Sequence, residues 1–125
     1  MQPSPAPLKM SELHTVQDSG LWEWIAVLLR RRLRFQVRGR SMLPLLDQGD
    51  EVFVDARKKV TKGDVIVLRH PYRIDIVLVK YVAFINEHGA VYVLGVNLVE
   101  STDSRSFGWV EPHQVYGCVH SRFRP

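Results

Sequence analysis

The apolar run at residues 74–85 (IDIVLVKYVAFI) limits the fold of this chain more than any other segment. Its β-branched and aromatic residues, with almost no polar interruption, predict a strand that is buried on both faces or lies in a barrel wall. Lys80 stands in the middle of this run. Burial lowers the pKa of a lysine because the charged amine loses its hydration, and a neutral amine is a candidate general base. The alternative is an edge strand from which Lys80 reaches water.

A tight turn is predicted earlier in the chain, at residues 39–44 (GRSMLP). Gly39 allows the backbone to approach a substrate closely, and Pro44 restricts the exit from the turn, so amides around Ser41 can point at one spot. A serine hydroxyl attacks a peptide carbonyl only when a base takes its proton and donors stabilise the charge on the carbonyl oxygen. Ser41 is therefore a candidate nucleophile with Lys80 as its base. The alternative is a turn serine that only satisfies the local backbone.

The rest of the chain predicts a mostly β fold. Further strands are expected at residues 35–38, 51–55, 64–68, 90–94 and 115–119, and turns at 58–63 and 87–89. Several short strands separated by glycine-marked turns indicate a small folded-over β-barrel. The composition agrees, because 125 residues of which 46% are hydrophobic can bury a single core.

The N-terminal part is predicted to lie apart from this domain. Residues 1–17 are expected to be a disordered tail, residues 18–33 a short helix with a basic end, and residues 34–125 the folded domain. The apolar part of the helix, residues 21–29, would be about 14 Å long against roughly 30 Å of bilayer hydrocarbon, so no transmembrane anchor is expected. We expect this helix to pack on the domain; the alternative is peripheral contact with a membrane surface.

The charged residues, histidines and cysteine of the chain exclude several classes of function. The formal net charge is +4, and arginines gather just before Ser41, at positions 30, 31, 32, 34, 38 and 40. They predict a solvated basic face, with attraction of an acidic or polar substrate segment as an alternative. RNA binding would need aromatic residues among these arginines, and only Phe35 qualifies, so no nucleic-acid partner is expected. The five histidines lack ligand spacing and Cys118 is the single cysteine, so neither a metal nor a disulfide is predicted.

Four segments with recognisable patterns follow one another in this chain. They are the Ser-Met-x-Pro turn, a segment at residues 63–67 (GDVIV) that is similar to Gly-Asp-x-Val, the lysine strand at 74–85, and a polar loop at 95–105 (GVNLVESTDSR). In this order they resemble the motifs of the signal peptidase I family of serine/lysine proteases. The resemblance extends over residues 35–119.

The resemblance implies a role for each residue that matches a family motif. Ser41 falls on the nucleophile and Lys80 on the general base. Ser101 falls on the serine that orients the lysine amine, and Asp103 and Arg105 fall on an ion pair behind the site. A Ser-His-Asp triad stays open on the residues alone, although the apolar context makes Lys80 the better base candidate.

Oxyanion and substrate contacts are expected around the nucleophile. Gly39, Ser41 and Met42 are the candidates: the Ser41 amide for the oxyanion, and the Met42 side chain for a shallow pocket that takes a small residue. The chain departs from the family at Gly39, where many members have a hydroxyl oxyanion donor. It also has Tyr81 where arginine is usual after the lysine, and Val96 where the loop usually has aspartate.

The function implied is that of a soluble cytoplasmic endopeptidase with a Ser/Lys dyad and no cofactor. Within the family, the short chain resembles the proteases that remove the N-terminal leader of nickel superoxide dismutase precursors, so such a precursor is the expected partner. One alternative is a self-cleaving domain of the SOS-repressor type, although no Ala-Gly or Cys-Gly pair precedes Ser41. The other is a non-enzymatic basic β-barrel that binds RNA or a membrane surface.

Overall fold

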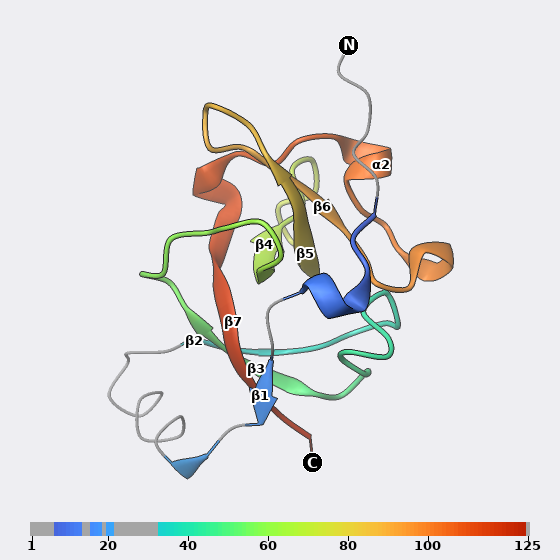
Figure 1. The fold of residues 1–125 in the computed structure, drawn as a ribbon, viewed down its shortest axis with the longest axis vertical. Helices are drawn as coiled ribbons and strands as arrows, with labels where there is room; N and C mark the ends of the chain where they lie inside the picture. The colour runs from blue at the N-terminus through green and yellow to red at the C-terminus, as the bar shows by residue number, and fades with distance from the viewer. Residues whose placement is uncertain (1–6, 14–15, 19, 22–32, 125) are drawn as a thin grey trace.

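Apart from residues 1–6, 14–15, 19, 22–32 and 125, the computed structural model describes the whole chain. It is built mainly from one sheet of seven strands (Figure 1). The strands are β1 (Gln17–Asp18), β2 (Leu33–Gln36), β3 (Glu51–Asp55), β4 (Val65–Arg69), β5 (Val77–Ile85), β6 (Val91–Leu94) and β7 (Val115–Phe123). The helical elements are short: α2 (Ser104–Phe107) and the 3-10 turns η1 (Met10–Glu12), η2 (Leu98–Glu100) and η3 (Pro112–Gln114). The predicted mostly β fold class is confirmed.

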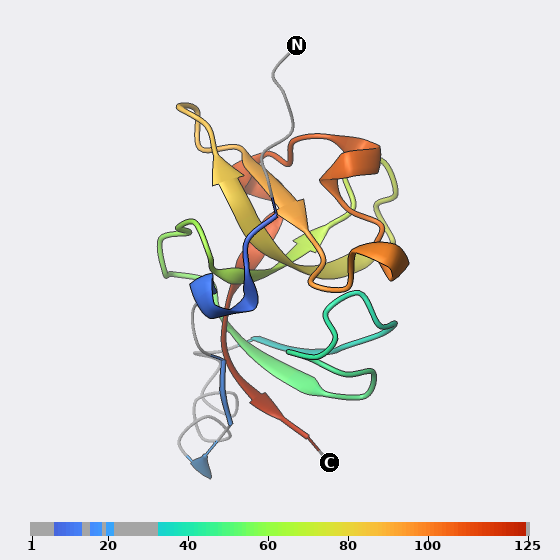
Figure 2. The same cartoon turned by 45° about the vertical axis from the view of Figure 1, so that its right-hand side comes forward.

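The long strand β7 joins the two halves of the sheet. The strand order is β2-β3-β7-β4-β5-β6, with antiparallel neighbours, and β1 adds to β7 in parallel. Figure 2 shows β7 running from the β4–β6 group to the β2–β3 group. At the crossing, a Cβ on Gly117 would lie 2.6 Å from the Asp55 carbonyl oxygen, so only glycine fits. Among the described residues the strand ladder ends at β2 and β6, so the sheet is open and does not close into a barrel.

Strand β4 and the middle of β5, residues 80–83, are buried on both faces. Val65, Val67 and Tyr81 point into one core cluster, which also contains Met42 and Leu46. Ile66, Leu68 and Val82 point into a second cluster, together with Phe107, Val110 and Cys118. Successive side chains of a strand alternate between faces, so a strand between two clusters must be apolar without interruption. This explains the apolar run around Lys80.

The start of β5 differs from the predicted strand at residues 74–85. The β4–β5 register pairs Arg69 with Val77, so residues 70–76 form the connection between the two strands. The His70 amide donates to the Ile76 carbonyl at 2.8 Å, and Ile74 is 76% exposed. The isoleucines of this segment have the composition of a strand, but antiparallel pairing of β4 with β5 requires a turn there.

Residues near the N-terminus contact the domain. The Leu8 amide donates to the Tyr81 hydroxyl at 3.1 Å, and Val16 is buried in the first core cluster. β1 pairs with β7 at Ser121 and Arg122. Most of the predicted helix at residues 18–33 lies outside the described residues. Within the described part of the chain, no helix has both the length and the apolar character that crossing a bilayer requires.

Candidate active site

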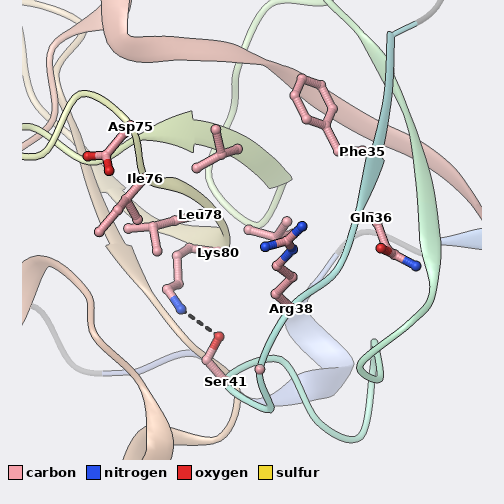
Figure 3. Close-up of a pocket in the computed structure, with 11 residues that line it drawn as sticks. Phe35, Gln36, Arg38, Ser41, Asp75, Ile76, Leu78 and Lys80 are labelled. Atoms are coloured by element: carbon pink, nitrogen blue, oxygen red, sulfur yellow. Dashed lines mark hydrogen bonds between the residues drawn. The ribbon is translucent and has the colours of Figure 1, made fainter.

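Ser41 and Lys80 meet although 39 positions separate them in the chain. The Lys80 amine donates to the Ser41 hydroxyl with Nζ and Oγ 2.5 Å apart (Figure 3). Ser41 lies in the turn after β2, and Lys80 lies in the middle of β5, where it pairs with Ile66 of β4. Pairing with β4 and burial on both faces hold the lysine backbone in place, so the amine is directed at the serine.

The Lys80 side chain lies in a low-dielectric environment. The residue is 3% exposed. Burial lowers the pKa of Lys80 to about 8, because the charged amine loses its hydration; the Asp103 carboxylate acts to raise this pKa and the Arg105 guanidinium to lower it. At pH 7 a group with this pKa is neutral in about a tenth of the molecules, which is enough for a general base.

Asp103 is the charged centre of the loop beside Lys80. It is 1% exposed and accepts hydrogen bonds from the Ser101 hydroxyl at 2.7 Å, the Gly95 amide at 3.1 Å and Arg105 Nε at 2.9 Å. Burial acts to raise the pKa of Asp103, but the hydrogen bonds from Arg105, Ser101 and the Gly95 amide outweigh it and hold this pKa below its usual value. Asp103 therefore stays ionised and supplies a fixed negative charge near the lysine.

The structure gives Ser101 a different hydrogen bond from the one expected. The prediction places its hydroxyl against the Lys80 amine, whereas in the described residues this hydroxyl donates to Asp103. Asp103 in turn acts electrostatically on Lys80. Arg105 closes the group by donating to the Leu98 carbonyl at 2.6 Å in addition to Asp103. The three residues of the loop thus form one cluster beside the lysine, and an orienting role for Ser101 stays a prediction.

Two further residues of this loop hold the turn that contains Ser41. The Asn97 amide donates to the Ser41 carbonyl at 2.7 Å, and its side-chain nitrogen donates to the Arg40 carbonyl at 3.1 Å. A Cβ on Gly95 would lie 2.7 Å from the Ser41 carbonyl oxygen and 2.6 Å from Ser101 Cβ, so the loop and the turn approach as closely as they do only because position 95 is glycine. Both residues lie in the polar loop at 95–105 that the sequence singles out, but the sequence predicts no role for either of them.

A cleft of about 600 Å³ opens beside the Ser41–Lys80 pair. Gly39 lines this cleft and has a φ of +78°, a backbone conformation that residues with a side chain rarely adopt. The Met42 side chain is 1% exposed, packs in the first core cluster and, among the described residues, does not line the cleft as predicted. Burial of a large apolar side chain is favourable, which explains why this turn residue packs inward. Within the described part of the chain, the backbone amide of Ser41 donates no hydrogen bond, which leaves it available to an oxyanion.

One edge of β5 faces this cleft without a partner strand. Residues 77–81 pair with β4 on one side, whereas pairing with β6 on the other side begins only at Tyr81. Within the described residues, the other side of 77–80 therefore lacks a strand. An extended peptide can add to such an edge through main-chain hydrogen bonds.

Comparison of the chain with known proteins adds the family. Residues 30–99 match the model of the Peptidase S24-like family, a segment that contains both Ser41 and Lys80. A search of the curated proteins found no match. The prediction of a serine peptidase type related to signal peptidase I is thereby supported at the level of the superfamily that includes both peptidase families. Because the match covers more than half of its residues, the chain belongs to the Peptidase S24-like family.

Proposed function

We propose that this chain is a serine endopeptidase in which Ser41 is the nucleophile and Lys80 the general base. The observation that carries the proposal is the 2.5 Å contact between the Ser41 hydroxyl and an amine that is 3% exposed. Neither group has this reactivity alone, because a serine hydroxyl keeps its proton near neutral pH and a solvated lysine stays charged. The family match supports a peptidase.

The proposed cleavage reaction can be followed through the proton that Ser41 and Lys80 exchange. The neutral Lys80 amine takes the Ser41 proton while Oγ attacks the peptide carbonyl carbon, and the Ser41 amide stabilises the oxyanion. The ammonium then gives this proton to the leaving amine, and an acyl-enzyme ester remains on Ser41. A water molecule, deprotonated by the same amine, hydrolyses the ester and restores the hydroxyl. The scissile peptide lies along the unpartnered edge of β5.

The activity of the wild-type enzyme should rise with pH. Only the neutral amine accepts a proton, so kcat/KM should increase about tenfold per pH unit below the Lys80 pKa of about 8 and level off above it. The measurement is kcat/KM on one peptide between pH 5.5 and 9.5, in buffers of constant ionic strength. A profile that is flat over this range would contradict a lysine base.

The substrate we propose is the precursor of a nickel superoxide dismutase. The proposal is supported by the resemblance of the four-segment pattern to proteases that remove such leaders. It also fits the chemistry of the product, since a metal enzyme that binds nickel through its own N-terminal amine needs its leader removed first. We place both proteins in the cytoplasm, where the single thiol of Cys118 stays reduced.

Co-expression tests this substrate. Precursor expressed with the wild-type chain should give a shortened, nickel-loaded dismutase, and precursor expressed with Ser41→Ala should remain full length; intact mass and N-terminal sequencing measure both. A precursor left uncut by enzyme that cleaves peptides would reject the substrate and leave the peptidase. Loss of an N-terminal fragment from the wild-type chain itself, but not from Ser41→Ala, would instead indicate a self-cleaving domain. Recovery of the chain in salt-resistant membranes would contradict the cytoplasmic location.

A further inference from the structure

Arg38 is an exposed cation that lines the cleft beside Ser41. Neighbouring arginines of the described chain already face carboxylates: Arg34 with Glu51 at 2.7 Å, and Arg40 with Glu100 at 4.0 Å. Among the described residues, Arg38 has no such ion pair. Its guanidinium is directed into the cleft, toward the wall that carries Leu78 and Lys80 (Figure 3). A permanently charged group with a planar fork of donors is therefore presented to whatever occupies the cleft.

The opposite end of the cleft carries the other sign of charge. Asp75 lines it there, and the apolar side chains of Ile76 and Leu78 lie between Asp75 and the lysine (Figure 3). No ion pair joins Asp75 to Arg38 within the described chain, so the two charges do not neutralise one another. The cleft thus presents a positive group near the Ser41–Lys80 pair, an apolar wall, and a negative group farther away.

The position of Arg38 limits which part of a bound peptide it can reach. The other residues that line the cleft come shortly before Ser41 on one wall and shortly before Lys80 on the other. Both walls therefore extend from the Ser41–Lys80 pair in the same direction (Figure 3). Arg38 is three residues before Ser41. The three residues from Arg38 to Ser41 span at most about 3.3–3.6 Å each, and an extended peptide advances about 3.3 Å per residue, so Arg38 can face only a peptide side chain within about three residues of the scissile bond.

We infer that the enzyme selects peptides that carry aspartate or glutamate within three residues of the scissile bond, on one side of it, and that Arg38 is the residue that recognises this carboxylate. The inference rests on the proposed peptidase function and names the chemistry of its substrates. A guanidinium donates two parallel N–H···O hydrogen bonds to a carboxylate, an arrangement that lysine or glutamine cannot reproduce. The unpartnered edge of β5 holds the peptide backbone, and Arg38 reads the side chain.

Peptide profiling tests the inference. Wild type, Arg38→Gln, Arg38→Glu, Arg57→Gln and Ser41→Ala are each incubated with an equimolar mixture of unstructured synthetic peptides in which all residue pairs are represented, and mass spectrometry identifies the cleaved bonds. The bonds that the wild type cleaves should be enriched in aspartate or glutamate within three residues of the bond, on one side of it only. Arg38→Gln should lose this enrichment, and Arg38→Glu should replace it with lysine and arginine. Arg57 is exposed and lies outside the cleft, so Arg57→Gln should keep the wild-type profile.

Kinetics on a matched pair of peptides give the second readout. The pair comprises one cleaved peptide and its copy with the acidic residue replaced by its amide. Arg38→Gln should lower kcat/KM about tenfold for the acidic peptide, mainly through KM, and leave the amide peptide within about twofold of wild type. Cleavage by wild type without acidic enrichment, or equal losses on both peptides, would overturn the inference while the peptidase stands. Absence of any Ser41-dependent cleavage would overturn the proposed function and this inference with it.

Discussion

Ser41→Ala and Lys80→Met should each lower kcat/KM for peptide cleavage on the order of 10⁴-fold, and the double variant should lose little more than either single one. In the proposed mechanism the hydroxyl and the amine act as one unit across their 2.5 Å contact, so removing either group removes the activated nucleophile. Methionine has about the length of lysine and no charge, and it suits the buried position. The measurement is kcat/KM of the three variants on one peptide at pH 8.

The fold should survive these substitutions. Position 80 is 3% exposed, and replacing a buried amine with a thioether removes a desolvated polar group, so the melting temperature of Lys80→Met should equal or exceed that of the wild type. Lys62→Ala is the matched control, because this lysine is exposed and lies outside the cleft. A Lys80→Met enzyme that is folded and retains near wild-type kcat/KM would rule out the lysine as the base.

Asp103→Ala should lower the free energy of unfolding by about 2–4 kcal/mol. Asp103 is 1% exposed, and its removal leaves the buried Gly95 amide and the Ser101 hydroxyl without their acceptor. Peptide cleavage should fall as well, because the loop that holds the Ser41 carbonyl would loosen. Chemical denaturation measures the first effect. The control is Asp18→Ala: this carboxylate forms an ion pair with Arg122 but is 81% exposed, so its loss should cost less than about 1 kcal/mol.

The same carboxylate should shape the acid limb of stability. The pKa of Asp103 in the folded chain lies below its usual value, so its contribution is complete above the usual pKa of aspartate and is lost as the pH falls through the folded value. Asp103→Ala should therefore be most destabilising near neutral pH and least destabilising at low pH. A loss of stability independent of pH between 2 and 7 would show that the charge of Asp103 does not contribute.

The sequence predicted the strands well where burial determined the side chains. Residues 51–55 form β3 with the predicted bounds, and the interior of the 74–85 run is buried on both faces as expected. The predicted strand begins three residues too early, because Ile74 and Ile76 have side chains typical of strands although they lie in the β4–β5 connection. Composition reports the preference of a side chain for burial, but strand pairing decides where the chain must turn.

Residue type and order are enough to predict that a lysine is costly to keep charged within an apolar strand, and that a serine stands in a turn bounded by glycine and proline, because these are local properties of the chain. That the two groups meet depends on the folded chain: the β4–β5 register fixes the position of Lys80 in the sheet, and the Gly95–Asn97 segment holds the Ser41 turn against it. The tertiary structure also decided that Met42 points into the core and that Arg38 lines the cleft without an ion-pair partner in the described chain. Contacts between distant residues depend on how strands pair and cross, and no single segment of the sequence carries that information.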